Sequence, residues 1–350
     1  MEERLSPAQY DTLDGVLEPA ENPKLFGHHD ARDLISVAVR SGKLHHGLLL
    51  TGPRGVGKAT LAFHLANWLN NQNVTALDVL DPSAPVFRQI AMGAHPGVLH
   101  LTRPANDRGN GFKTALTVEE IRRIGRFLSM TAHDGGWRVV IIDAADDMNR
   151  NAANALLKNL EEPPARTVFI LIAHSIGGLL PTIRSRCQLI RLQPLDKDDL
   201  LASLAGIDDM AAIVAENGEA LAQRAAGSVR QAIVLTQHGG LEIASALDKL
   251  ASAPSLDIAA AHKLAEAVSG RDKSVTLEIF NARSLELLAD SAARSAESHD
   301  LDRANLLANA WQDARIAITD TNTYNLDQKQ HALTMIRRLN LALGRQDVRT

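Results

Sequence analysis

Residues 48–64 read LLLTGPRGVGKATLAFH, and this stretch decides the fold. Three leucines are typical of a buried strand, and the apolar-periodic segment from Thr60 onward predicts a helix. Between them, GPRGVGK fits the phosphate-binding pattern G-x-x-x-x-G-K in the strand-to-helix setting that it requires. Such a turn exposes backbone N–H groups at the positive end of a helix, where phosphate oxygens bind. The stretch therefore predicts a nucleotide site at Gly52, Gly55, Gly57 and Lys58; a glycine-rich turn that binds nothing is the alternative.

The position after the lysine departs from the pattern. Ser or Thr normally stands there and ligates Mg²⁺, whereas this chain has Ala59, which offers no side-chain oxygen. Thr60 comes one residue late, and one residue of a helix is about 100° of rotation. We therefore expect Thr60 to contribute only to a degenerate site, in which ATP or ADP binds with Mg²⁺ weak or absent.

A second stretch, residues 138–146, reads RVVIIDAAD. A buried apolar strand that ends in an aspartate is the arrangement in which a carboxylate positions Mg²⁺ beside a P-loop, and Asp143 has that place. In many ATPases of this kind a glutamate follows and orients the attacking water, but here the residue is Ala144. Because Ala59 and Ala144 are two separate losses, the chain is not expected to hydrolyse ATP efficiently.

Composition limits the classes of function. The chain has 350 residues, of which 45% are hydrophobic and 22% charged, as in ordinary globular proteins of two or three domains. Its net charge of −4 gives no overall positive field, so any DNA contact has to be local or shared with partners. Cys187 is the single cysteine, which excludes an intrachain disulfide and a cysteine-based zinc cluster. The single cysteine fits a reducing compartment, so we expect a cytoplasmic protein. No membrane contact is expected, because no apolar run has the length of a membrane helix.

Strands and helices alternate over residues 25–193, which predicts a doubly wound parallel sheet. Residues 1–24 are polar and interrupted by prolines, and an extended or partly disordered arm is expected there. The rest of the chain is strongly helical, with a linker rich in Ala, Ser and Pro near residues 251–255.

Three stretches together carry a family resemblance: GPRGVGKATLA, VVIIDAADDMNRNAANALLKNLEEPP and PTIRSRCQ, in this order. They resemble the clamp-loader branch of the AAA+ family over roughly residues 20–240. The resemblance implies an α/β P-loop AAA+ domain at residues 25–195, with a parallel sheet covered by helices on both faces. A small helical lid at 196–245 and an all-α collar or oligomerisation domain at 250–350 would follow, after the amino-terminal arm at 1–24.

The resemblance also implies roles for two arginines. In the family the Ser-Arg-Cys motif supplies an arginine finger, and the matching Arg186 would act in trans on ATP held by a neighbouring motor subunit. Arg230 matches the sensor 2 arginine, which reaches the nucleotide from the lid. The alternatives are an arginine paired with a carboxylate at a strand start, and an ordinary solvated helix arginine. Many relatives carry a four-cysteine zinc module before the Asp143 strand, and since this chain has no cysteine there, no zinc is expected.

The leading hypothesis is a non-motor clamp-loader subunit of the bacterial DNA polymerase III holoenzyme. By the resemblance it joins the ATPase subunits (gamma or tau) and the delta subunit in a hetero-oligomeric ring that loads the sliding clamp on primed DNA in replication. The polymerase activity belongs to another chain. Two alternatives stay open: an ATP-hydrolysing motor subunit like gamma or tau, and a helical interaction protein whose P-loop is vestigial.

Overall fold

The computed structural model describes residues 5–106, 111–129, 136–207, 210–270 and 273–344. The chain divides into two compact units, residues 1–232 and residues 233–350. Helix α9 (Val229–Gln237) continues across the division. The expected boundary near residue 245 falls inside helix α10 (Gly240–Ser252), and the division into a separate lid and collar stays a prediction.

The first unit is built on a parallel sheet of five strands in the order β2-β3-β4-β1-β5. The strands are β1 (Gly47–Thr51), β2 (Val98–Leu101), β3 (Arg138–Asp143), β4 (Thr167–Ala173) and β5 (Gln188–Arg191). Strand β1 lies between β4 and β5. Because all strands are parallel, their carboxyl ends meet at one edge, where the P-loop leaves β1 and Asp143 ends β3. The predicted parallel sheet is confirmed.

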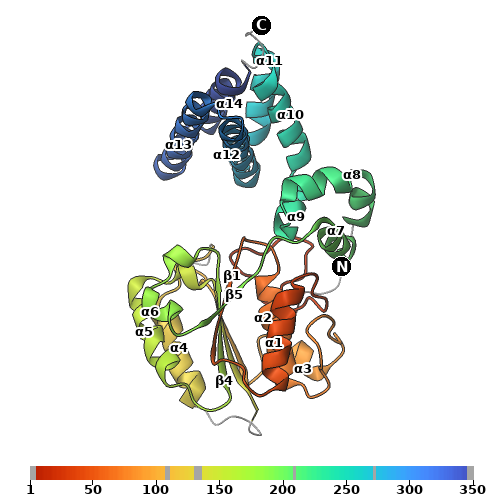
Figure 1. Cartoon of the computed structure of the whole chain (residues 1–350), viewed down its shortest axis with the longest axis vertical. Helices are drawn as coiled ribbons and strands as arrows, with labels where there is room; N and C mark the ends of the chain where they lie inside the picture. The colour runs from red at the N-terminus through yellow and green to blue at the C-terminus, as the bar shows by residue number, and fades with distance from the viewer. Residues whose placement is uncertain (1–4, 107–110, 130–135, 208–209, 271–272, 345–350) are drawn as a thin grey trace. The chain divides into compact units, whose positions relative to one another are not determined.

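Helices cover both faces of this sheet, as Figure 1 shows. One face bears α1 (His29–Arg40), α2 (Lys58–Asn70) and α3 (Pro85–Ala91), and the other bears α4 (Val118–Ser129), α5 (Arg150–Glu161) and α6 (Pro181–Arg184). A hydrophobic core lies on each face of the sheet, and successive side chains of β1 pack into the two cores alternately. Leu48 and Leu50 belong to one core and Leu49 belongs to the other. Burial on both sides explains why β1, β3 and β4 read as continuous apolar runs.

Two single turns and two further helices complete the first unit. Two single turns, η2 (Ala145–Asp147) and η3 (Ile176–Gly178), follow the ends of β3 and β4. Helices α7 (Lys197–Ala205) and α8 (Met210–Ala225) come after β5. Asp196 caps α7, because its carboxylate accepts the backbone N–H of Asp199 at 2.8 Å.

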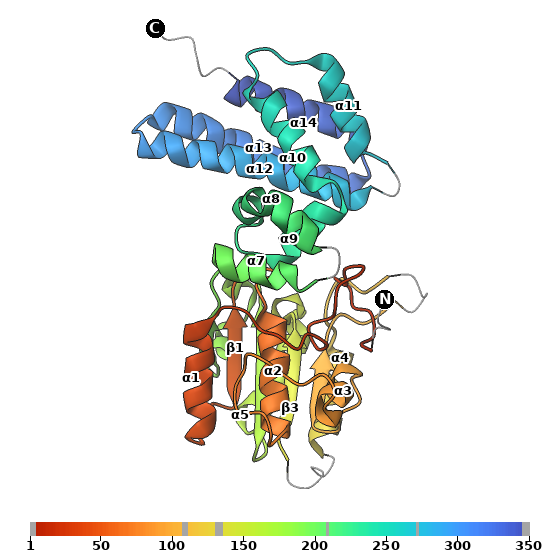
Figure 2. The ribbon, with the colours of Figure 1, turned by 90° about the vertical axis from the view of Figure 1, so that its right-hand side faces the viewer.

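Residues 5–21 form a packed segment, which we call the arm, rather than a loose extension. The arm has no helix or strand, and in Figure 2 it passes, in dark red, across one end of the sheet. Its fold is fixed by the buried carboxylate of Glu21, which accepts the backbone N–H groups of Leu5, Ser6 and Glu18. The Ser6 hydroxyl in turn donates to the Ala91 carbonyl of α3 at 2.6 Å. The expectation of an extended or partly disordered arm thus missed these contacts.

The second unit is helical, as expected for the carboxy-terminal part. After α10 it contains α11 (Ile258–Val268), α12 (Ser274–Glu297), α13 (Leu301–Tyr324) and α14 (Gln328–Leu343). Figure 2 shows α12 and α13 side by side as a long antiparallel pair. Polar contacts join α10 to its neighbours: Arg283 pairs with Asp248 at 2.9 Å, and the Asn340 amide donates to the Leu250 carbonyl at 2.9 Å.

Candidate functional site

The P-loop has a backbone that only glycine accommodates well. Gly55 has φ +74° and Gly57 has φ +102°, in the left-handed region, and Gly57 immediately precedes α2. A Cβ atom at Gly52 would lie 2.2 Å from the Leu192 carbonyl oxygen, so the loop packs directly on the segment after β5. The three glycines picked from the sequence therefore shape one turn at the carboxyl edge of the sheet.

Lys58 is held by the loop itself. Its ammonium donates to the carbonyls of Gly52 at 2.8 Å and Pro53 at 2.5 Å, and the side chain is only 4% exposed. Burial lowers the pKa of Lys58 to about 8, although Asp143 and Asp146 oppose the shift. Among the described residues, no acceptor is found for the backbone N–H groups of residues 54–58. These N–H groups form a cradle suited to phosphate oxygens.

The site offers few side chains that could ligate a metal ion. Ala59 has no ligand atom, and Thr60 is buried within α2. The Asp143 side chain keeps some exposed surface but is densely surrounded by protein, and burial, followed by repulsion from Asp11, raises its pKa to about 7. Because Ala59 offers no oxygen and Thr60 is buried, the residues present do not fit a tightly bound metal.

Two carboxylates beside Asp143 have structural partners that the sequence did not reveal. Asp146 accepts the backbone N–H groups of His174 at 3.1 Å and Ser175 at 3.0 Å. The backbone directly after β4 is thus held in place by the Asp146 carboxylate. Asp147 pairs with Arg103 through two bonds of 2.6 Å. Nothing in the sequence pattern pointed to Arg103 as this partner.

Arg230 packs against the P-loop through its Cβ atom, and its sensor 2 role stays a prediction. Its Cβ atom lies so close to Gly55 that a Cβ added there would be 2.3 Å away. The two residues before Arg230 are hydrogen-bonded to the P-loop. The Ser228 hydroxyl donates to the Arg54 carbonyl, and the Val229 N–H donates to the Gly55 carbonyl, both at 2.9 Å. The Arg230 guanidinium itself donates to the backbone carbonyl of Asp11 in the arm.

Arg186 lies elsewhere. It comes two residues before β5, whose first residue is level with Leu48 near the start of β1. Arg186 is therefore at the amino edge of the sheet, whereas the P-loop leaves the carboxyl edge. The length of β1, at about 3.3 Å a residue, separates the two edges. The guanidinium is half-buried and bonds to Glu161 at 2.8 Å and to the Thr182 carbonyl at 2.9 Å.

Cys187 follows the arginine and packs against Gly47 at the start of β1. A Cβ atom at Gly47 would lie 3.2 Å from the sulfur. Burial raises the pKa of the Cys187 thiol to about 11, so at neutral pH the side chain is an uncharged, small apolar group. Its role here is packing.

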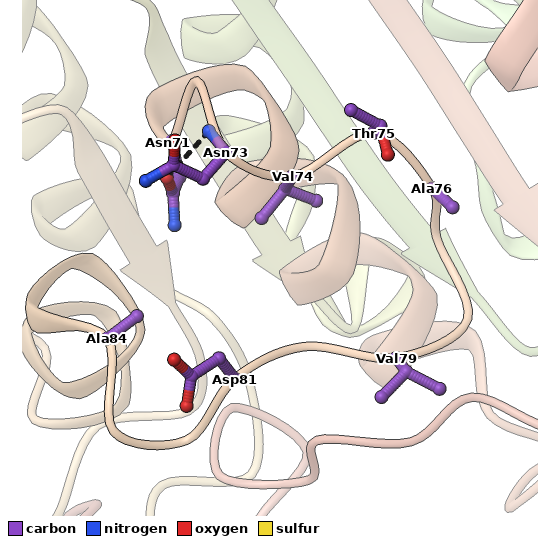
Figure 3. Close-up of a pocket in the computed structure, with 8 residues that line it drawn as sticks. All are labelled: Asn71, Asn73, Val74, Thr75, Ala76, Val79, Asp81 and Ala84. Atoms are coloured by element: carbon purple, nitrogen blue, oxygen red, sulfur yellow. Dashed lines mark hydrogen bonds between the residues drawn. The ribbon is translucent and has the colours of Figure 1, made fainter.

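A surface pocket of about 270 Å³ lies beside the loop that follows α2, as Figure 3 shows. It is lined by Asn71, Asn73, Val74, Thr75, Ala76, Val79, Asp81 and Ala84, none of which belongs to the P-loop.

Over the described ranges no group of three or more His, Cys, Asp or Glu side chains is placed to hold a metal ion. Within the same ranges, no helix is both long and apolar enough to cross a membrane.

The sheet order, the P-loop after β1 and the aspartate that ends β3 define the first unit as an α/β P-loop domain of the AAA+ class. Comparison with known proteins is more specific. The family described as "DNA polymerase III, delta subunit" matches residues 27–196, just under half of the chain, and through these residues the chain is similar to that family.

The curated relatives agree with this family. DNA polymerase III subunit delta' of Pseudomonas aeruginosa is 40% identical over 142 residues, which are 41% of this chain and 41% of that protein. The delta' subunit of Yersinia pestis is 37% identical over 42% of this chain and 41% of its own length. A gamma subunit of Buchnera aphidicola is 29% identical over 78% of this chain and 74% of its length. The match to the delta' relatives thus spans less than half of their length.

A DNA polymerase III gamma subunit-related protein from Thermotoga maritima has a TM-score of 0.48 at 16% identity, covering 88% of this chain and 99% of that structure.

Proposed function

We propose that this chain is a non-motor, delta-prime-like subunit of a DNA polymerase III clamp loader. In this role it offers Arg186 to nucleotide on a neighbouring subunit and does not turn over ATP efficiently itself. Its partners are ATPase subunits of the gamma or tau type and a delta subunit in a hetero-oligomeric ring. Through that ring it contributes to loading the sliding clamp on primed DNA.

The position of Arg186 carries the proposal. An arginine that served this chain's own P-loop would have to lie at the carboxyl edge of the sheet, whereas Arg186 lies at the amino edge. A guanidinium is always charged and bonds phosphate oxygens through two parallel N–H groups. Glu161 and Thr182 hold it at the surface, where a second subunit can reach it. These contacts support action in trans on a partner's nucleotide.

The chain's own site supports binding without hydrolysis. The backbone N–H groups of residues 54–58 and the ammonium of Lys58 suit the phosphates of ATP or ADP. Ala59 and Ala144 lack the oxygen atoms that would ligate Mg²⁺ and orient a water. We therefore propose a retained nucleotide site whose affinity depends on Lys58 and hardly on Mg²⁺.

The test is a reconstituted ring with gamma or tau, delta, this chain, the sliding clamp and primed DNA. Rings containing Arg186→Ala should assemble as the unmodified ring does, because Arg186 is partly exposed and bonded to exposed groups, but should hydrolyse ATP several-fold more slowly. Arginine fingers are worth about 10³-fold or more at a single site, and one finger among several sites costs less in steady state. Arg184→Ala, an exposed arginine of α6, is the matched control. Equal hydrolysis by the Arg186→Ala ring would refute the proposal.

The motor subunit is the second candidate, and the retained Lys58 and Asp143 favour it. It requires ATP turnover by the purified chain, stimulated by clamp and primed DNA, that collapses on Lys58→Ala. Absence of turnover under those conditions would exclude a motor. A vestigial P-loop, in contrast, requires that neither ATP nor ADP bind and that Lys58→Ala leave assembly unchanged.

A further inference from the structure

The arm approaches the nucleotide site from two sides. Tyr10 lies under the guanidinium of Arg103, with 4.4 Å from the guanidinium carbon to the ring centre, and Arg103 is bonded to Asp147 beyond the end of β3. The next residue, Asp11, is bonded to Arg230, which packs on Gly55 of the P-loop. Consecutive Cα atoms are 3.8 Å apart, so these two residues bridge the P-loop and the acidic end of β3. Phosphates bound to a P-loop lie between the same two elements.

Asp11 holds the Arg230 guanidinium through oxygen atoms. It presents two oxygens to Arg230: the backbone carbonyl, which accepts a hydrogen bond, and a carboxylate oxygen 3.8 Å from the same guanidinium nitrogen. An arginine of the sensor 2 type takes a pair of phosphate oxygens in a comparable way. While Asp11 holds Arg230, this guanidinium is not available to a nucleotide.

We infer that the arm is an intramolecular occupant of the nucleotide site, and that ATP or ADP binds only when Tyr10 and Asp11 move away. This inference rests on the proposed nucleotide site and concerns how that site is regulated. With the arm docked, Lys58 is bonded to Gly52 and Pro53, and Arg230 is bonded to Asp11. When the arm moves away, Arg230 becomes available to the phosphates.

The packing of the arm supports this assignment. Glu18 is 5% and Glu21 is 6% exposed, and both carboxylates are satisfied by donors within the arm: the Thr12 hydroxyl for Glu18, and backbone N–H groups for Glu21. Such internal bonds make the arm a formed unit that docks as a whole. Burial, followed by the carboxylates of Asp11 and Asp143, raises the pKa of Tyr10, so its hydroxyl stays neutral beside the acids.

Calorimetry with ADP and with ATP, without added Mg²⁺, tests the inference on the full chain. The double variant Tyr10→Ala/Asp11→Ala removes the ring beside Arg103 and the carboxylate near Arg230, so the arm docks more weakly. This variant should bind nucleotide at least tenfold more tightly than the unmodified chain. Adding Lys58→Ala to the double variant should abolish the gain, which places the nucleotide at the P-loop. Asp14→Ala, an exposed acid of the same arm, is the matched control and should leave affinity unchanged.

Hydrogen exchange on the unmodified chain gives a second measurement that needs no variant. Saturating ADP should speed amide exchange in residues 5–21. An affinity of the double variant within twofold of the unmodified chain, or bound ADP that leaves arm exchange unchanged, overturns the arm's role while the nucleotide site survives. If no variant binds ADP or ATP, both the proposed nucleotide site and the role of the arm are refuted. The Arg186→Ala assay still tests the proposed arginine finger independently.

Discussion

Glu161, the last residue of α5, accepts a bond of 2.8 Å from Arg186, which precedes β5. The two residues are 25 positions apart, and the pair joins two of the stretches that carry the family resemblance. Both side chains are partly exposed, so the pair contributes little to stability, about 0–1 kcal/mol. Its effect is to fix the direction of the guanidinium.

Replacing Glu161 by Gln should therefore affect the partner's catalysis more than folding. We expect a two- to fivefold lower rate of ATP hydrolysis by the reconstituted ring, because a misdirected arginine loses part of its contact with the phosphates. The free energy of unfolding, measured in urea, should change by less than about 1 kcal/mol. Glu162→Gln, the exposed neighbour, is the control. Hydrolysis at the unmodified rate in the Glu161→Gln ring would show that the carboxylate does not position the finger.

Asp143 should make stability depend on pH. Its pKa is about 7 in the folded chain and 3.8 in the absence of structure, so between these values the folded state binds more protons than the unfolded state. The free energy of unfolding therefore falls as pH rises through that window. Asp143→Asn has no such charge and should be more stable than the unmodified chain at pH 8 by roughly 2–4 kcal/mol, with the difference vanishing near pH 4.

Urea unfolding at pH 4, 6 and 8 measures this difference directly. Asp33→Asn, at an exposed position of α1, serves as the control and should show no comparable trend. A difference that stays constant over the three pH values would mean that Asp143 is charged in the folded chain throughout, contrary to the burial argument.

Gly55 and Gly93 form a matched pair for testing the contact between the P-loop and Arg230. Both have positive φ, +74° and +67°, but a Cβ at Gly93 meets nothing within 4 Å, whereas one at Gly55 would lie 2.3 Å from the Cβ of Arg230. Gly93→Ala should cost about 1 kcal/mol, the backbone strain alone. Gly55→Ala should cost at least about 2 kcal/mol more, because overpacking is added to the strain. Equal losses in thermal unfolding would argue against the close approach of Arg230.

Asn340 tests how α10 is attached to α14. Its amide donates to the carbonyls of Leu250 at 2.9 Å and Ala253 at 2.8 Å, so one side chain holds the end of α10. Asn340→Ala should lower the free energy of unfolding by about 1–3 kcal/mol, since two partly buried carbonyls lose their donor. Asn305→Ala, on an exposed face of α13, should change it by less than about 0.5 kcal/mol. A smaller loss for Asn340→Ala than for Asn305→Ala would contradict the described bonds.

Features with local causes could be predicted from the sequence. Strands β1, β3 and β4 are continuous apolar runs, and α5 begins where Asn149 accepts the Ala152 N–H at 2.9 Å, a cap visible in the sequence. Helix α3 was missed because its seven residues are too few to show a period, although Pro85 is a typical first helical residue. The roles assigned to Lys58, Arg186 and Arg230 stay predictions, and the structure adds where each one lies.

Features that depend on contacts between distant segments could not be predicted. The bond from Arg230 to Asp11 joins residues 219 positions apart, and the pair of Arg103 with Asp147 joins residues 44 apart. No periodicity or spacing in one sequence encodes such partners. For the same reason the arm was expected to be loose, because its own residues are polar and its order comes from a surface formed by other parts of the chain.

The shielded thiol of Cys187 makes this chain convenient for labelling. With a pKa of about 11, only about one molecule in 10⁴ carries the reactive thiolate at pH 7. A cysteine introduced at an exposed position would therefore take up a maleimide dye long before the native one, without any need to remove it. One substitution, Arg184→Cys, would then place a fluorophore two residues from Arg186 and report optically on the arrival of a neighbouring subunit.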